Sequence, residues 1–207
     1  HNTPKRYANL LEALKTDVKD RAKDCADLLA QTLKYRKEFS LIQKSLESGE
    51  IPERIAHNDP KINNILFDRD TNDVKCIIDL DTVMPGSCLF DFGDGLRSLF
   101  TGDNESNRDS SLLKVNFETY ELYCQGYLSE MKEVLTPREI EFLPYSVFTL
   151  AMELGMRFLD DYLRGDVYFK TSFVDENLVR ARGQFALAQD IMNNMSKLTE
   201  ITKKYAK

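Results

Sequence analysis

Apolar residues recur at steps of three and four along most of this chain, and only the segment from Arg54 to Leu80 interrupts the pattern. This spacing places apolar side chains on one face of a helix, as in helices that pack around a core. It predicts one long helix that opens the chain at Leu11 and continues to a turn at Ser48. Further helical stripes run through 117–131 and 178–198.

The most specific helix start is Thr136-Pro137-Arg138-Glu139, a capping box with proline at the first helical position. The helix that it opens should run past Pro144 towards Gly165. With 42% hydrophobic residues in 207, the chain can bury a core as one domain. The sequence therefore predicts a mainly α fold with a small β element.

That β element consists of three short runs, Arg54–Ala56, Ile65–Asp68 and Val74–Ile78. The polar residues between the last two runs predict a hairpin with Thr71 and Asn72 at the centre of its turn. In that register Asn64 lies directly opposite Asp79, at a separation of ~5 Å. Met84-Pro85-Gly86 predicts a further turn after the hairpin.

Charge and cysteine content exclude several classes of function. A net charge of −6 disfavours a surface that neutralises nucleic-acid phosphates. No apolar run approaches the ~20 residues of a membrane span. Four cysteines without a C-x-x-C pair and two histidines assemble no zinc site. We expect a cytoplasmic protein with free thiols and with no nucleic-acid or membrane partner.

Polar residues with catalytic potential gather around the predicted hairpin. Asp59 and Asn64 lie five residues apart before its first strand, and Asp79 ends its second strand, with Asp81 two residues beyond. Magnesium prefers one or two carboxylates together with other oxygen ligands, which Asn64 and Asp79 can supply. Asp59 remains free to orient a hydroxyl group and to accept its proton. This division of roles is typical of phosphoryl transfer.

These segments resemble the kinase catalytic loop H-x-D-x-x-x-x-N followed by a metal-binding Asp. The version HNDPKINNILFD, followed by IIDLDTVMPG, is most similar to the aminoglycoside phosphotransferase and choline kinase superfamily. Within it, IIDLDTVMPG, FDFGD and GMRFLDDYLRGDVYF resemble N-acetylhexosamine 1-kinases over nearly the whole chain. Those enzymes use ATP to phosphorylate the anomeric hydroxyl of GlcNAc or GalNAc.

The resemblance implies a role for each matching position. It makes Asp59 the catalytic base, Asn64 and Asp79 the Mg²⁺ ligands, and Asp81 a further acidic group near the metal. Lys61 matches a lysine that contacts the transferred phosphate, where negative charge develops, although it could equally be a solvated charge. ATP is the implied co-substrate and a small sugar the implied substrate.

Four other residues have more local interpretations. Arg157 and Tyr168 match positions expected to face the sugar, although Arg157 could equally form a helix-face ion pair with Asp160 or Asp161, and Tyr168 could be a packing aromatic. His57 is expected to hold the catalytic loop. Asp91 is expected to support that loop by hydrogen bonds.

The motif Asp91-Phe92-Gly93 resembles the metal-binding D-F-G of protein kinases, but it lies beyond the hairpin and its following turn. Gly93-Asp94-Gly95 is only half of a dinucleotide-binding fingerprint, because Ser98 occupies the third glycine position, and it therefore does not predict a dinucleotide site.

Two rival functions remain open at this stage. The run Cys76–Val83 also resembles the first motif of haloacid dehalogenase-type phosphatases, with Asp79 as nucleophile and Asp81 as acid/base. That function requires a parallel α/β sheet. The other rival is a non-catalytic regulatory module on a kinase scaffold.

A kinase also needs a Gly-rich lid and a Lys–Glu pair from an N-terminal lobe, and neither is recognisable before Asp59. We therefore expect residues 1–207 to be a kinase-like C-terminal catalytic lobe (α+β) without its N-terminal lobe. On its own this lobe should fold but should phosphorylate sugar negligibly.

Overall fold

The computed structural model describes all residues from His1 to Lys207. Its eight α-helices are α1 (Thr3–Thr16), α2 (Ala26–Lys34), α3 (Leu41–Glu47), α4 (Cys88–Thr101), α5 (Phe117–Met131), α6 (Pro137–Arg164), α7 (Glu176–Asn193) and α8 (Met195–Tyr205). Its four short strands are β1 (Arg54–Ala56), β2 (Ile65–Phe67), β3 (Val74–Ile77) and β4 (Met84–Gly86). The fold is mainly α, as the sequence predicts.

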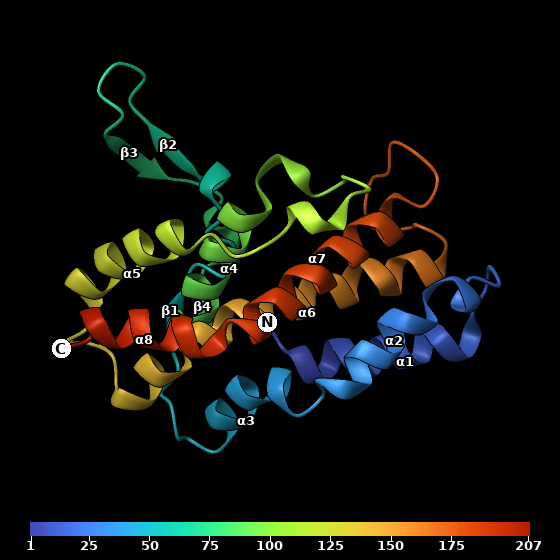
Figure 1. The fold of residues 1–207 in the computed structure, drawn as a ribbon, viewed down its shortest axis with the longest axis horizontal. Coiled ribbons are helices and arrows are strands. Elements are labelled where there is room, and N and C mark those ends of the chain that lie inside the picture. Colours follow the sequence, from blue (N-terminus) through green and yellow to red (C-terminus); the bar gives the residue numbers. More distant parts are fainter.

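The 28-residue helix α6 lies at the centre of the helical body and contacts α1, α4, α7 and α8 (Figure 1). Its predicted start is confirmed, because the Thr136 hydroxyl accepts the Glu139 N–H at 3.2 Å and the Glu139 carboxylate accepts the Thr136 N–H at 2.8 Å. The helix ends at Gly165, whose φ of 98° suits a residue without a Cβ. These caps fix both ends of the element that organises the core.

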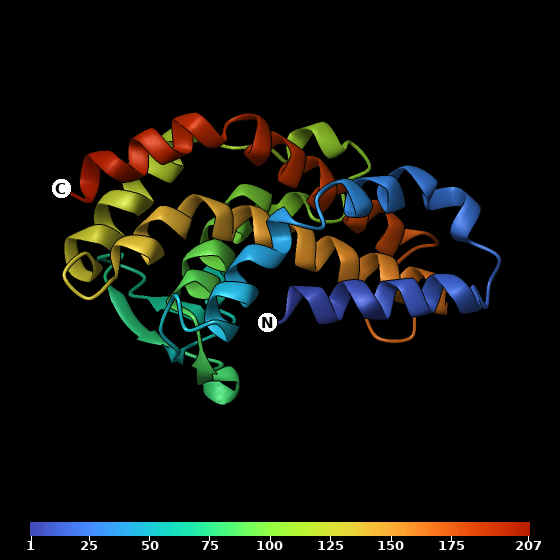
Figure 2. The same cartoon turned by 90° about the horizontal axis from the view of Figure 1, so that it is seen from below.

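The first part of the chain differs from the prediction of one long helix. α1 ends at Asp17, which adopts a left-handed φ of 33° and accepts backbone N–H groups of Arg21 and Ala22 on its carboxylate. The chain then turns and continues as the separate helices α2 and α3 (Figure 2). The predicted single helix is wrong because this local Asp cap competes with helix continuation.

The hairpin exists, but its register differs from the prediction. Ile65 pairs with Ile77, and the ladder then shifts so that Phe67 pairs with Val74. Asn64 therefore faces Ile78, whose N–H donates to the Asn64 carbonyl at 2.9 Å, and not Asp79. A bulge and a connection of residues 68–73, longer than a two-residue turn, cause the slip.

The segment Met84-Pro85-Gly86 is strand β4 and not the predicted turn. It pairs antiparallel with β1, with Ala56 opposite Met84 and Arg54 opposite Gly86. Both sheets are two-stranded and antiparallel, so the parallel sheet that a dehalogenase-type phosphatase requires is absent. None of the four cysteines forms a disulfide. No helix is both long enough and apolar enough to cross a membrane.

Candidate active site

The loop after β1 is held against the start of α4 by one carboxylate. Asp91 accepts the backbone N–H of His57 at 2.8 Å and that of Asn58 at 2.7 Å. Burial raises the pKa of Asp91, and the two N–H donors counteract part of this effect. Because Asp91 lies in the first turn of α4, the positive end of the helix dipole also favours its ionised form. Asp91 therefore anchors the loop from below.

His57 connects this loop to the end of the hairpin. Its Nδ1 accepts the backbone N–H of Asp59 at 3.3 Å, and its Nε2 lies 3.1 Å from the carbonyl oxygen of Ile78. An acceptor at Nδ1 and a donor at Nε2 define a single tautomer. His57 thus fixes the backbone of Asp59 relative to the segment that leads to Asp79.

The side-chain amide of Asn64 lies at the centre of the site. Its Nδ2 is 2.7 Å from the Asp59 carbonyl oxygen, 3.1 Å from Asp59 Oδ2 and 3.3 Å from Asp79 Oδ2. Asn64 is 5% exposed, whereas Asp79 is exposed. The structure therefore brings Asp59, Asn64 and Asp79 together in spite of the register slip.

The slip is compensated by the backbone of Asp79. This residue has a left-handed φ of 64°, which Asp tolerates better than most residues, and directly precedes the short 3₁₀ turn Leu80–Thr82. Asn58, which directly precedes Asp59, has a similar φ of 63°. Such conformations cluster at functional sites because the surrounding structure must hold them.

Lys61 contacts the carboxylate of Asp59. Its Nζ lies 2.8 Å from Asp59 Oδ2, and both side chains are partly exposed. The ammonium group therefore neutralises this carboxylate. The lysine and the aspartate face the same cavity.

Asn64 and Asp79 carry oxygen atoms of the kind that magnesium prefers as ligands. All three hydrogen bonds of the Asn64 side chain are made by Nδ2, and Oδ1 has no hydrogen-bond partner in the protein. The exposed Asp79 carboxylate lies 3.3 Å from Nδ2 of the same amide, and Asp81 is exposed two residues further on without a hydrogen bond. No three His, Cys, Asp or Glu side chains form a closed metal cluster. Magnesium does not require one, because it usually combines one or two carboxylates with substrate phosphates and water.

His1 is a part of the site that the sequence analysis did not identify. Its Nδ1 lies 2.8 Å from Glu153 Oε1, and its Nε2 lies 2.9 Å from the carbonyl oxygen of Asn58. Both partners are acceptors, so the ring donates twice as an imidazolium. Burial lowers the pKa of His1, but the hydrogen bond and charge of Glu153 outweigh burial and raise it overall. The buried Glu153 also accepts the Thr3 hydroxyl at 2.8 Å.

A cavity of about 710 Å³ opens beside Asp59 and Lys61. Arg157 and Tyr168 line the same cavity, so the structure places the two expected sugar contacts and the expected catalytic group around one space. Arg157 forms no ion pair with Asp160 or Asp161, and its guanidinium instead lies 5.4 Å from the Phe169 ring centre. The ion-pair alternative is therefore wrong for Arg157.

The wall that carries Tyr168 is shaped by Asp161, which the sequence offered only as an ion-pair partner. The buried carboxylate of Asp161 accepts the backbone N–H groups of Val167, Tyr168 and Phe169 at 3.0, 2.8 and 2.9 Å. It also accepts the side-chain amide of Asn177 at 2.9 Å. These four donors compensate the burial of the charge and hold the loop against the cavity.

The cavity contains further polar residues that sequence reasoning missed. Asp94 and Arg97 come from α4, Glu153 from α6 and Arg180 from α7. The i,i+3 spacing of Asp94 and Arg97 is visible in the sequence, but it is equally typical of a surface ion pair. Only the packing of α4 against α6 shows that this pair is enclosed.

One comparison with known proteins bears on this site. The family model APH, described as the phosphotransferase enzyme family, matches residues 2–129. The matched range covers more than half of the 207 residues and includes the β1–β2 loop, the hairpin and α4. The resemblance to the aminoglycoside phosphotransferase superfamily is thereby confirmed.

Proposed function

Since the chain belongs to the phosphotransferase enzyme family, we propose that it transfers the γ-phosphate of ATP to the anomeric hydroxyl of an N-acetylhexosamine such as GlcNAc or GalNAc. The observation that carries this proposal is one shared cavity: Asp59 and Lys61 line it together with Arg157 and Tyr168. A kinase-type base and two groups suited to a sugar therefore face the same space.

The residues around Asp59 suit the chemical step. The Asp59 carboxylate would accept the proton of the sugar hydroxyl as its oxygen attacks phosphorus. Lys61, 2.8 Å from that carboxylate, would move its ammonium group to the phosphoryl oxygens on which charge develops. Asn64 would keep Asp59 in position through two contacts from one amide. A magnesium ion held by Asn64 and Asp79, with Asp81 nearby, would neutralise charge on the ATP phosphates.

The other side of the cavity suits a sugar. The rings of Tyr168 and Phe169 pack edge to face, with their centres 4.8 Å apart, and they offer apolar surface to sugar C–H groups. Arg157 offers donors to a carbonyl or hydroxyl oxygen, since none of its nitrogens has a protein acceptor. Most of the residues that line the cavity are polar or charged, which suits a ligand rich in hydroxyl groups.

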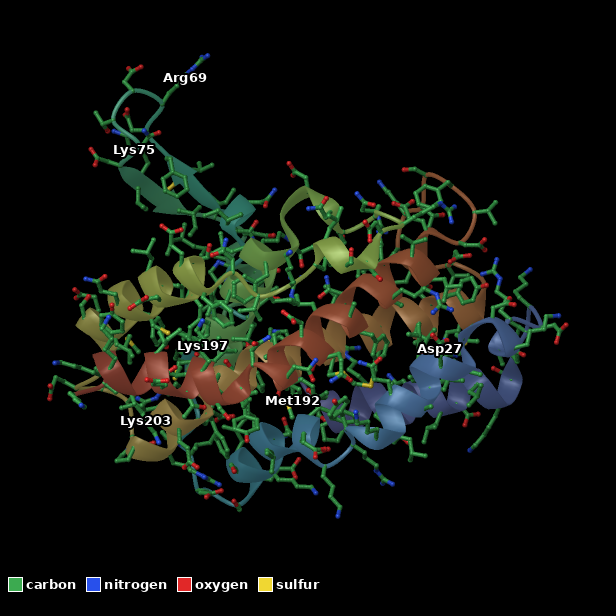
Figure 3. The ribbon with its side chains drawn as sticks, in the orientation of Figure 1. Asp27, Arg69, Lys75, Met192, Lys197 and Lys203 are labelled. Carbon is green, nitrogen blue, oxygen red and sulfur yellow. The ribbon has the colours of Figure 1, made fainter.

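We also propose that residues 1–207 act as the C-terminal catalytic lobe of a kinase and that a nucleotide-binding lobe covers the hairpin. Leu66, Phe67, Val74 and Ile77 are all exposed there, between 45% and 62%. The hairpin extends away from the helices, and Arg69 at its tip points outward (Figure 3). Exposed apolar patches commonly mark interaction sites. The partners would be ATP, the sugar and this lobe in the cytoplasm, and the net charge of −6 argues against nucleic acid.

The test is a substrate panel with the complete protein, ATP and Mg²⁺. The panel contains GlcNAc, GalNAc, glucose, choline and an aminoglycoside, and ³¹P NMR shows whether the product is an anomeric phosphate. We expect turnover of an N-acetylhexosamine in wild type and loss of that turnover in Asp59→Asn. A preference for choline or the aminoglycoside would keep the family and refute the substrate. Nucleotide binding without any turnover would instead favour a regulatory module.

A further inference from the structure

Asp94 and Arg97 form an ion pair in the cavity wall. Arg97 Nε lies 2.7 Å from Asp94 Oδ1, and each residue is only 6% exposed. On α4, Asp94 lies about one turn and Arg97 about two turns beyond Asp91, the anchor of the catalytic loop. The pair and the anchor thus share one rigid helix.

Half of this pair is unused by the protein. The one hydrogen bond of these two side chains joins Arg97 Nε to Asp94 Oδ1. Asp94 Oδ2 and both terminal nitrogens of Arg97 therefore have no hydrogen-bond partner in the protein. The fully enclosed unpaired atoms of the protein belong to other residues, so these three atoms reach solvent. Both residues line the cavity beside Asp59, and the free atoms therefore open into it.

Stability alone does not account for such a pair. Moving two charges from water into a nearly buried site costs several kcal/mol per ion, and the attraction between them repays this only with complete hydrogen bonding. Here the carboxylate and guanidinium groups are incompletely bonded. A ligand with donors and acceptors at the right spacing would complete them.

We propose that the Asp94–Arg97 pair recognises two neighbouring hydroxyl groups of the sugar, and this inference rests on the proposed sugar kinase function. Asp94 Oδ2 accepts the proton of one hydroxyl, and the Arg97 guanidinium donates to the oxygen of its neighbour. The pair is a specificity determinant, because Asp59 binds the hydroxyl that reacts. A sugar that lacks one of the two hydroxyls leaves a nearly buried charged group unpaired, which is how polar sites reject analogues.

The experiment compares each parent N-acetylhexosamine with its 3-deoxy, 4-deoxy and 6-deoxy derivatives, using the complete protein, ATP and Mg²⁺. In wild type we expect kcat/KM to fall about 10- to 100-fold for the derivatives that lack a recognised hydroxyl. In the double variant Asp94→Asn/Arg97→Gln the same deletions should cost less than about threefold, since uncharged amides lose less when left unpaired. Activity on the parent sugar should also fall in this variant.

The matched control is Glu12→Gln/Lys15→Gln, which removes an exposed ion pair of the same i,i+3 spacing that does not line the cavity. It should keep the full penalty for each deoxy sugar. Thermal unfolding checks that both double variants fold. If the cavity variant does not fold, Arg97→Lys retains the charge, loses the planar fork, and should reduce the same penalty.

Three results would overturn the proposal, and they differ in what they say about the proposed function. If wild type phosphorylates N-acetylhexosamines but tolerates every deoxy sugar, or if the double variant keeps the wild-type penalties, the pair does not read the hydroxyls and the sugar kinase function stands. If no sugar is phosphorylated while another receptor is, the proposed function itself is wrong and this inference falls with it.

Discussion

The side-chain amide of Asn64 lies 3.3 Å from the carboxylate of Asp79, although the hairpin ladder places Asn64 opposite Ile78. The left-handed backbone of Asp79 turns its carboxylate back towards Asn64. The same amide also contacts Asp59 at 3.1 Å. One buried side chain therefore couples the expected base to the expected metal ligand.

Replacing the base should slow chemistry more than binding. In the complete protein, Asp59→Asn should lower kcat by about 10²- to 10⁴-fold because the amide cannot accept the hydroxyl proton. Steady-state kinetics at saturating ATP and Mg²⁺ measure this. Asp70→Asn at the exposed hairpin tip is the matched control and should retain wild-type kcat. An unchanged kcat in Asp59→Asn would remove this residue as the base.

Replacing the metal ligand should weaken the metal–nucleotide complex. Since loss of an outer-shell partner of a metal already costs about 10- to 100-fold, Asp79→Asn should raise the Mg²⁺ concentration for half-maximal activity by at least about tenfold. A magnesium titration at fixed ATP measures the shift. Asp81→Asn should shift it less, because Asp81 makes no contact with Asn64. Equal shifts in the two variants would contradict the assignment of Asp79 as the main ligand.

The His1–Glu153 contact should make stability depend on pH. The pKa of His1 is raised and that of Glu153 is lowered, in both cases because their mutual hydrogen bond and attraction outweigh burial. The contribution of His1 to the free energy of unfolding is therefore complete below its unfolded pKa of about 6.5. It is lost as pH rises through the raised pKa of His1 in the folded protein. The contribution of Glu153 is present above about pH 4.5 and is lost as pH falls through its lowered folded pKa.

Urea unfolding of the complete protein at pH 6 and pH 9 tests this dependence. From about pH 6 to pH 9, the free energy of unfolding should fall by about 1 kcal/mol more in wild type than in His1→Gln. The glutamine retains a donor for the Asn58 carbonyl but carries no charge. An equal fall in both proteins would show that the imidazolium contributes nothing to the change in unfolding free energy between pH 6 and pH 9.

Removing the Asp161 charge should loosen the cavity wall. Asp161→Asn replaces an acceptor of four hydrogen bonds by an amide and should cost about 1–3 kcal/mol of unfolding free energy. We also expect the KM for the sugar to rise about tenfold with a smaller effect on kcat, since Tyr168 binds and does not react. Asp160→Asn, which breaks only a partly exposed pair with Arg164, should stay within about 0.5 kcal/mol. Similar effects of the two substitutions would argue against the positioning role of Asp161.

Local signals predicted the helices best. The capping residues Thr136 and Glu139 and the terminal Gly165 act within one turn, so the bounds of α6 could be predicted from sequence. The break after α1 could not, because it depends on whether the Asp17 carboxylate accepts backbone N–H groups or faces solvent. Helical apolar spacing continues across that break and conceals it.

Some features of the candidate site could likewise be predicted from local sequence, and others could not. Asp59 and Asn64 are neighbours in one loop, so their proximity could be predicted. The hairpin register could not, because Asp68 caps the connection by accepting N–H groups of Asp70 and Thr71, and this lengthens it. Contacts between segments far apart in the sequence, such as that of His1 with Glu153, depend on packing that no short segment encodes.

Helix α4 carries the anchor of the catalytic loop on one turn and a polar pair in the cavity wall on the next two. If that pair selects the receptor, a lineage can exchange one acceptor molecule for another by substitutions at two positions without disturbing the machinery that activates it. New receptor preferences would then arise on an unchanged reaction, and the residues at positions 94 and 97 would be the first to compare between enzymes with different sugars.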